Sequence, residues 1–332
     1  GRISTGELAI QHAALFKQAV SKMPSNRHKR AQYRDLTISE ILNIDIPESD
    51  QLSRATQQKY VTRFGSFLAW LKGYIHRDLD QPLKRAIKLG GNPRDERLKY
   101  SNEDLKRLFN SRDYVQGTHD APYKYWVPLI ALYTGARINE ICQLMLTGVY
   151  QQSELKIWVF DINETNSEHT QKSLKRPYHS RLVPVHKELI RLGFIEFVCE
   201  LKKQGEIRLF PELPYNGNKN KFANKAMRWF NNTYTNALNC NIQTPKTSFH
   251  SIRHSVLDYL QKIGKINLSE WAELFGQLAA GNEGQRRYAK SHELPEFEQC
   301  INKINFNHCL DAQSIRPWTR QEFATEIIVR CS

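Results

Sequence analysis

Apolar residues recur at helical spacing along most of the chain. Before residue 90 the clearest helical pattern follows Ser53, a residue type that often caps a helix N-terminus. The apolar positions of this segment lie three or four residues apart or adjacent to one another: Tyr60, Phe64, Phe67, Leu68 and Leu71. That spacing predicts an amphipathic helix that buries these side chains and carries Lys59, Arg63 and Lys72 on its other faces.

A second helical region follows a glycine-rich break. Residues 101–104 are a capping sequence for a helix that continues through Phe109, and residues 126–144 are rich in apolar side chains at helical spacing. Thr134-Gly135-Ala136 interrupts the longer stretch. Helical patterns dominate again from Lys187 onward.

Two short segments alternate as strands do. Residues 155–161 alternate around Ile157 and Val159, and residues 181–185 are rich in β-branched side chains. The polar segment between them suits a hairpin. The predicted fold class is therefore mainly α with a small antiparallel β-sheet.

The segment 88–97 separates the two helical regions. It combines Gly90-Gly91, an Asn92-Pro93 turn signal and mixed charge, as interdomain linkers do. With 332 residues, the chain is also longer than one ordinary core. We expect an N-terminal extension over residues 1–30, a helical domain over 31–92, a second domain over 93–306 and a C-terminal tail over 307–332.

Charge makes a polyanionic partner the leading expectation. Lys and Arg number 48 against 34 Asp and Glu, which gives a formal net charge of +14. Residues 51–90 alone hold eight Lys or Arg against two Asp. Nucleic acid is the first candidate and an anionic membrane surface the second.

Other classes find no support in the sequence. No run of 18 apolar residues and no signal-peptide core is present, which predicts a cytoplasmic protein without a membrane span. The six cysteines lack metal-binding spacing and are expected to be reduced thiols. No cofactor motif occurs, and paired carboxylates that could hold two catalytic metal ions are missing.

Four features far apart in the sequence carry candidate chemistry. They are Thr134-Gly135-Ala136-Arg137-Ile138-Asn139-Glu140, the hairpin 174–184 with Lys175, His250-Ser251-Ile252-Arg253-His254, and Gly276-Gln277 followed by Arg287-Tyr288-Ala289-Lys290. A spacing of three residues places Arg137 beside Glu140, and His250 beside Arg253, on one helical face. Glycine before Arg137 permits close approach of the backbone.

This ordered set resembles the tyrosine recombinase family, which includes phage-type integrases and Xer-like recombinases and shares its catalytic domain with type IB topoisomerases. The likeness covers residues 54–304 and includes the hairpin exit Arg-x-Val-Pro-Val-His-x-Glu-Leu. The resemblance implies a SAM-like core-binding domain over 31–92 and a catalytic domain over 93–306. It also implies a homotetramer that closes around double-stranded DNA recombination sites.

The resemblance assigns roles to the site residues. Tyr288 would attack a DNA phosphodiester, leaving a 3′-phosphotyrosyl bond and a free 5′-hydroxyl, without ATP or another cofactor. Arg137 and Arg253 would clamp the nonbridging oxygens, since guanidiniums bind them in a bidentate way and stay charged. Lys175 would protonate the departing 5′-oxygen, with Lys172 as the alternative lysine.

Further residues complete the implied site. His250 matches the imidazole that assists the nucleophile, and Glu140 matches the acidic residue that holds this imidazole or a clamp arginine. DNA phosphates would be contacted from the N-terminal domain by the following basic residues: Arg54, Lys59, Arg63 and Lys72. Gln277 departs from the family, which has His or Trp there. Its amide can donate a hydrogen bond but cannot carry charge.

The function expected is a site-specific DNA recombinase, the integrase of a phage, genomic island or other mobile element. Two alternatives remain open: a monomeric type IB-like topoisomerase, and a catalytically weak DNA-binding accessory protein, which Gln277 would suit. Near the C-terminus the apolar residues Phe297, Cys300, Ile301, Ile304 and Phe306 form a candidate helix for docking on a neighbouring protomer.

Overall fold

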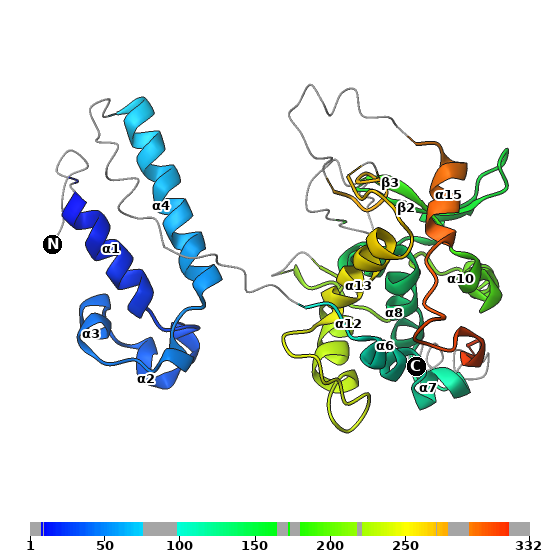
Figure 1. Ribbon diagram of the computed structural model, residues 1–332, viewed down its shortest axis with the longest axis horizontal. Coiled ribbons are helices and arrows are strands. Elements are labelled where there is room, and N and C mark those ends of the chain that lie inside the picture. Colours follow the sequence, from blue (N-terminus) through cyan, green and yellow to red (C-terminus); the bar gives the residue numbers. More distant parts are fainter. Residues whose placement is uncertain are drawn as a thin grey trace. The chain divides into compact units, whose positions relative to one another are not determined.

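The computed structural model describes residues 8, 10–75, 98–164, 172, 180–217, 221–269, 271–277 and 292–318. The chain divides into two compact units, residues 1–96 and 97–332 (Figure 1). The predicted linker, residues 88–97, lies outside the described residues.

The first unit is helical throughout its described part. Its helices are α1 (Ile10–Lys22), α2 (Ala31–Arg34), α3 (Ile38–Asn43) and α4 (Arg54–Tyr74). Helix α1 packs against both α3 and α4. One small core joins Ala13 of α1 to Val61, Leu68 and Leu71 of α4, and a second lies around Ile41 of α3.

Helix α4 begins where the sequence predicts, because the Ser53 hydroxyl accepts a hydrogen bond from the Thr56 N–H. The prediction is wrong for two of the apolar side chains. Tyr60 is 48% exposed and Phe67 is 42% exposed. Successive residues of a helix are rotated by about 100°, so Phe67 cannot share the buried face centred on its neighbour Leu68.

The second unit is mainly helical with a small sheet. Its helices are α6 (Asn102–Phe109), α7 (Arg112–Gln116), α8 (Pro122–Thr134), α9 (Ile138–Cys142), α10 (Lys187–Arg191), α11 (Phe194–Lys203), α12 (Asn224–Trp229), α13 (Phe249–Lys262) and α15 (Leu294–Asn302). Helix α8 is buried on all sides except at Lys124, and it contacts α9, α10, α12 and α13. A helix that is apolar all round belongs at the centre of a domain, which is where α8 lies (Figure 1).

The sheet has three antiparallel strands in the order β1 (Val149–Gln151), β2 (Trp158–Ile162) and β3 (Arg181–Pro184). Strand β2 begins three residues later than the alternation at 155–161 predicts. Residues 152–156 instead form the turn from β1, in which Lys156 has a positive φ of 58°. Strand β1 is too short to show an alternation in the sequence.

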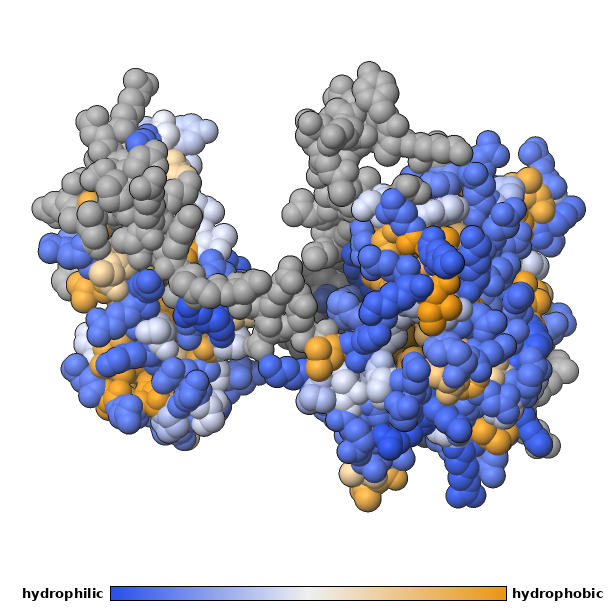
Figure 2. Space-filling model, viewed as in Figure 1, coloured by the Kyte–Doolittle hydropathy of each residue, from blue (hydrophilic) through white to orange (hydrophobic). Residues whose placement is uncertain are grey.

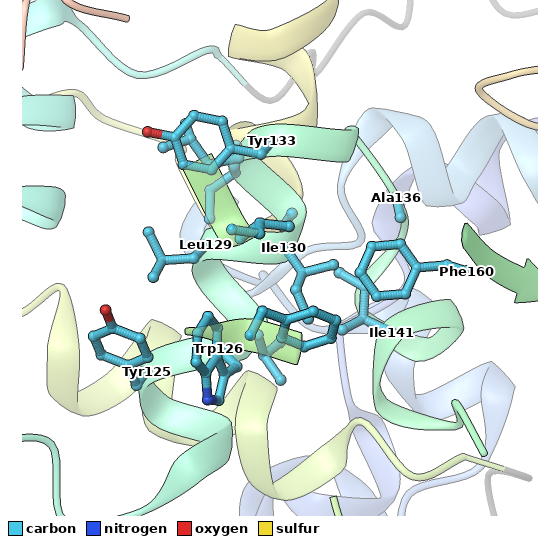
Figure 3. Packing of buried hydrophobic residues seen from close by; sticks show 14 of the residues in the cluster. Tyr125, Trp126, Leu129, Ile130, Tyr133, Ala136, Ile141 and Phe160 are labelled. Atoms are coloured by element: carbon cyan, nitrogen blue, oxygen red, sulfur yellow. The ribbon is translucent and has the colours of Figure 1, made fainter. Parts of the chain in front are cut away.

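One continuous core joins α8 to the sheet. Figure 3 shows Trp126 and Ile130 of α8, Ile141 of α9 and Phe160 of β2 in this core. Trp126 is fully buried and Tyr133 nearly so, as expected of core aromatics, whereas Trp271 is only partly buried. The outer face of this unit is mostly hydrophilic on the side drawn in Figure 2.

Helix α15 corrects the expectation of a docking helix. Its side chains Phe297, Cys300 and Ile301 are buried, and Ile304 and Phe306 after it are buried too. The helix packs on β3, and all five residues belong to the core of their own chain. They therefore cover one end of the sheet rather than awaiting a neighbouring protomer.

Two buried histidines occur in this core. His186 caps α10: its Nδ1 accepts from the Glu188 N–H at 3.0 Å, so its Nε2 carries the proton and donates to the Ile304 carbonyl at 3.0 Å. His119 lies among aromatic rings, and neither ring nitrogen has a hydrogen-bond partner among the described residues. Burial lowers the pKa of each to about 3.

These histidines predict a stability that depends on pH. Their pKa is lower in the folded chain than the ordinary value of 6.5, so below pH 6.5 the unfolded chain binds more protons. The free energy of unfolding should fall as the pH falls below about 6.5, by about 1.4 kcal/mol per pH unit for each histidine. Urea unfolding at pH 5 to 8 measures this slope. In His119→Phe the slope should decrease by about one proton, and an unchanged slope would contradict the assignment.

Candidate active site

Arg137 follows a tight turn between two helices. Helix α8 ends at Thr134, Gly135 takes a positive φ of 65°, and Arg137 stands at the N-terminus of α9. The Glu140 carboxylate accepts from the Arg137 N–H at 2.9 Å and from its Nη1 at 2.8 Å. The Arg137 side chain is 24% exposed, so this guanidinium reaches the surface while its base is held by Glu140.

Arg253 lies one turn into α13 and is almost fully buried. Its Nη1 donates to the Gly135 carbonyl at 2.6 Å, and its Nη2 donates to the Phe275 carbonyl at 2.7 Å. Arg253 thus binds the turn before Arg137 to the segment before Gln277. Three of the four predicted features therefore meet at Arg253, although they lie far apart in the sequence.

A third guanidinium, from Arg181, completes the cluster. Arg181 begins β3, and its Nη2 donates to Glu140 Oε2 at 2.9 Å while its Nε donates to the Leu274 carbonyl at 2.9 Å. Its side chain is 6% exposed. Arg181 stands in the predicted hairpin exit, yet it is not among the predicted site residues. The sequence signal that could have identified Arg181 is the alternation of a strand. Residues two apart lie on the same face, so Arg181 lies on the face of the core residue Val183.

The turn 271–277 receives all three guanidiniums on successive carbonyl groups. Arg181 donates to Leu274, Arg253 to Phe275, and Arg137 to Gly276 at 3.0 Å. Gly276 has a φ of +56°, and a Cβ there would lie 2.7 Å from Arg181 Nη1 and 3.2 Å from Arg137 Nη1. A glycine is required because the two guanidiniums occupy the space of a side chain.

Electrostatic coupling binds the cluster together. Burial, aided by the charges of Arg137 and Arg181, lowers the pKa of Arg253 to about 9, which leaves it charged at neutral pH. Burial alone would raise the pKa of Glu140, but Arg181 and Arg137 hold it at about 2. Three guanidiniums and one carboxylate give the cluster a net charge of +2, which suits an anionic ligand.

Of the other predicted catalytic residues, the structure describes His250 and Gln277. His250 is partly buried at the start of α13, where its ring meets the ring of His254 at 4.8 Å and nearly at right angles. Gln277 is exposed and directly follows the carbonyl that Arg137 binds. Lys175 and Tyr288 lie outside the described residues.

Lys172, the alternative hairpin lysine, is described. Its Nζ donates to Asn163 Oδ1 at 2.8 Å, just beyond the end of β2. Burial lowers the pKa of its ammonium group, which makes it a better proton donor than an exposed lysine.

The residues of the first unit that are predicted to contact DNA lie along α4. Arg54, Lys59 and Arg63 are exposed, and Lys72 is partly so. Within the described ranges, no group of three His, Cys, Asp or Glu side chains is arranged to hold a metal ion. The helices described there also include none with the length and apolar character to cross a bilayer.

The packing at Gly276 predicts a large effect of one methyl group. Gly276→Ala should lose about 1–2 kcal/mol from its left-handed backbone and about 1–3 kcal/mol more from displacing two hydrogen-bonded guanidiniums. The matched control is Gly205→Ala, since Gly205 also has a positive φ but nothing within 4 Å of its Cβ position. Urea unfolding of both variants compares the two losses. An equal loss of unfolding free energy in the two variants would contradict the prediction, because it would mean that the guanidiniums move aside without cost.

Comparisons with known proteins give one structural likeness. No family model and no curated protein matches the chain. Among solved structures, the chain is similar to the Tn1549 transposon integrase in complex with transposon right end DNA. The identity is 16% and the TM-score 0.38, and the alignment covers 72% of this chain and 83% of that chain. A similarity at this level does not assign an activity to this chain, so the activity is argued from the chain's own residues.

Proposed function

We propose that the chain is a tyrosine-type site-specific DNA recombinase, the integrase of a phage, genomic island or other mobile element. It cleaves and rejoins DNA through a 3′-phosphotyrosyl intermediate. The observation that carries the proposal is the buried cluster of Arg137, Arg181 and Arg253 around the single carboxylate of Glu140. Its members come from the sequence features that resemble the tyrosine recombinases.

The charge of the cluster fits phosphoryl transfer. A phosphodiester carries one negative charge, and more charge develops on its nonbridging oxygens as a fifth oxygen approaches phosphorus. A preformed site of charge +2 therefore binds the transition state better than the ground state. Within the described structure, the side chain of Arg137 uses two of its five N–H groups, for Glu140 and Gly276, and the others can face a phosphate.

Tyr288 is the proposed nucleophile. It follows Gln277 by eleven residues and precedes His292 by four, and an extended chain spans roughly 3.3 Å per residue. The segment from Gln277 to Tyr288 is therefore long enough to return to the cluster, which lies against Gly276. His250, three residues before Arg253, assists as general acid or base.

The departing 5′-oxygen needs a proton. Lys175 is proposed as its donor, from its position in the hairpin that Arg181 ends. Lys172 is the alternative, and its lowered pKa favours it chemically. No metal ion or other cofactor is part of the proposal.

The predicted SAM-like core-binding domain, residues 31–92, is proposed together with α1, because α1 packs on α4 and shares its core. Its exposed Arg54, Lys59 and Arg63 on α4, with Lys72, would contact DNA phosphates. The assembly proposed on two recombination sites is a homotetramer. A binding-only accessory role is the second candidate function, because Gln277 replaces a cationic or aromatic residue of the family.

The decisive variant is Tyr288→Phe. Nicked duplexes tiled across the DNA on both sides of the gene serve as substrates, and adducts resistant to detergent are counted on gels. Wild type should form an adduct on some duplexes, because a nick lets the 5′-hydroxyl diffuse away. Tyr288→Phe should form none and keep its DNA affinity within about twofold, since only the attacking oxygen is removed.

The matched control is Tyr150→Phe, which removes a phenol oxygen from β1 and should leave adduct formation intact. An adduct formed by Tyr288→Phe would disprove the nucleophile. Binding without any wild-type adduct would favour the accessory role. Relaxation of supercoiled plasmid without recombinant product would favour the topoisomerase.

The role of α4 is tested by the salt dependence of DNA binding. Removing one cation that binds a phosphate should reduce the slope of log Kd against log salt concentration by about 0.9. Lys59→Gln combined with Arg63→Gln should therefore reduce the slope by about 2 on any duplex. Lys202→Gln with Lys203→Gln on α11 removes the same charge and should leave the slope unchanged. Equal slopes in the two double variants would reject a role of α4 in DNA binding.

A further inference from the structure

We propose that Arg181 is a positioning residue of the reaction, a third guanidinium that fixes Arg137 and the turn 274–277 without itself contacting DNA. This inference rests on the proposed function. It concerns a residue outside the predicted set of two arginines, lysine, histidine, glutamine and tyrosine.

Among the described residues, Arg181 donates to Glu140 and to the Leu274 carbonyl, and each of these belongs to a group that holds Arg137. Its Nη2 binds Glu140, the carboxylate that also binds the Arg137 N–H and Nη1. Its Nε binds the Leu274 carbonyl, two residues before the carbonyl that binds Arg137 Nη2. Arg181 therefore fixes the guanidinium of Arg137 from two sides.

Arg137 and Arg181 differ in exposure, and this difference distinguishes a phosphate-contacting role from a positioning role. Arg137 is 24% exposed and can reach a phosphate at the surface, whereas Arg181 is 6% exposed and lies against Gly276. A side chain so enclosed can act on a DNA phosphate only through its neighbours. The same holds for Arg253, which is 4% exposed and binds two carbonyls, so of the three guanidiniums Arg137 alone is placed to contact the phosphate directly, and the expected clamp by Arg253 is not part of this inference. Arg181 also begins β3, so it binds this strand to the turn 271–277.

The shape of the guanidinium matters as well as its charge. Arginine donates from Nε and Nη2 in two fixed directions, which matches one carboxylate and one carbonyl. A lysine has its donors on a single atom and cannot reproduce this bridge. Arg181→Lys therefore tests the geometry at constant charge, and Arg181→Gln tests the loss of charge.

A matched control exists in the same unit. Arg191 also bridges a carboxylate and a carbonyl: its Nε donates to Glu188 at 2.7 Å and its Nη2 to Ala312 at 2.8 Å. Neither acceptor belongs to the cluster around Glu140. Arg191→Gln thus removes a similar pair of hydrogen bonds away from the proposed chemistry.

The experiment measures single-turnover adduct formation on the nicked duplex that wild type cleaves, together with the Kd for that duplex and urea unfolding. Arg181→Gln should slow adduct formation about 100-fold while Kd changes less than about threefold. Arg181→Lys should recover less than about a tenth of the lost rate. Arg191→Gln should cleave within about threefold of wild type.

Two results would overturn the inference. One is a rate for Arg181→Gln equal to that of Arg191→Gln, and the other is a loss of affinity as large as the loss of rate, which would make Arg181 a DNA contact. If Arg181→Gln does not fold, Arg181→Lys decides by the same criteria. Wild-type adduct formation is measured first, so failure of the proposed function is seen separately from failure of this inference.

Discussion

The site depends on three guanidiniums, two buried and that of Arg137 partly exposed, that bind three successive carbonyl groups. Without the carbonyls of Leu274, Phe275 and Gly276, and the carboxylate of Glu140, three cations would repel one another in a poorly hydrated environment. Buried charges are tolerated only when they are paired and hydrogen-bonded. The arginines and the turn 271–277 therefore fix each other's positions.

Such a network favours accuracy of placement over stability. Replacing a buried ion cluster by apolar side chains often leaves a protein as stable or more so, so stability alone does not account for this one. Its four charged members come from three regions that are remote in the sequence: Arg137 and Glu140 at the start of α9, Arg181 in β3 and Arg253 in α13. A single anionic ligand on the exposed side of Arg137 would bring the charge of the cluster closer to neutral.

The sequence predicts the parts of this structure that rest on local patterns. The cap at Ser53, the break at Gly135 and the pairing of Arg137 with Glu140 are each encoded within a few residues. The partners of Arg181 and Arg253 are mostly backbone carbonyls from elsewhere in the chain, and a carbonyl leaves no mark in a sequence. The prediction fails at two aromatic side chains of α4 for a related reason, since the side of α4 on which α1 packs is set by a contact between distant segments.

Gln277 is best understood from the same network. Under the proposed function, Gln277 stands where the tyrosine recombinases have histidine or tryptophan, so one charge-assisted contact worth roughly 1.5–3 kcal/mol would be absent. The charge that remains is carried by guanidiniums, which stay protonated across the range in which an imidazole would titrate. In the proposed reaction, transition-state charge would then be stabilised by groups that do not respond to pH near neutrality. Gln277 is exposed beside the carbonyl that Arg137 binds, and there its amide could donate a neutral hydrogen bond.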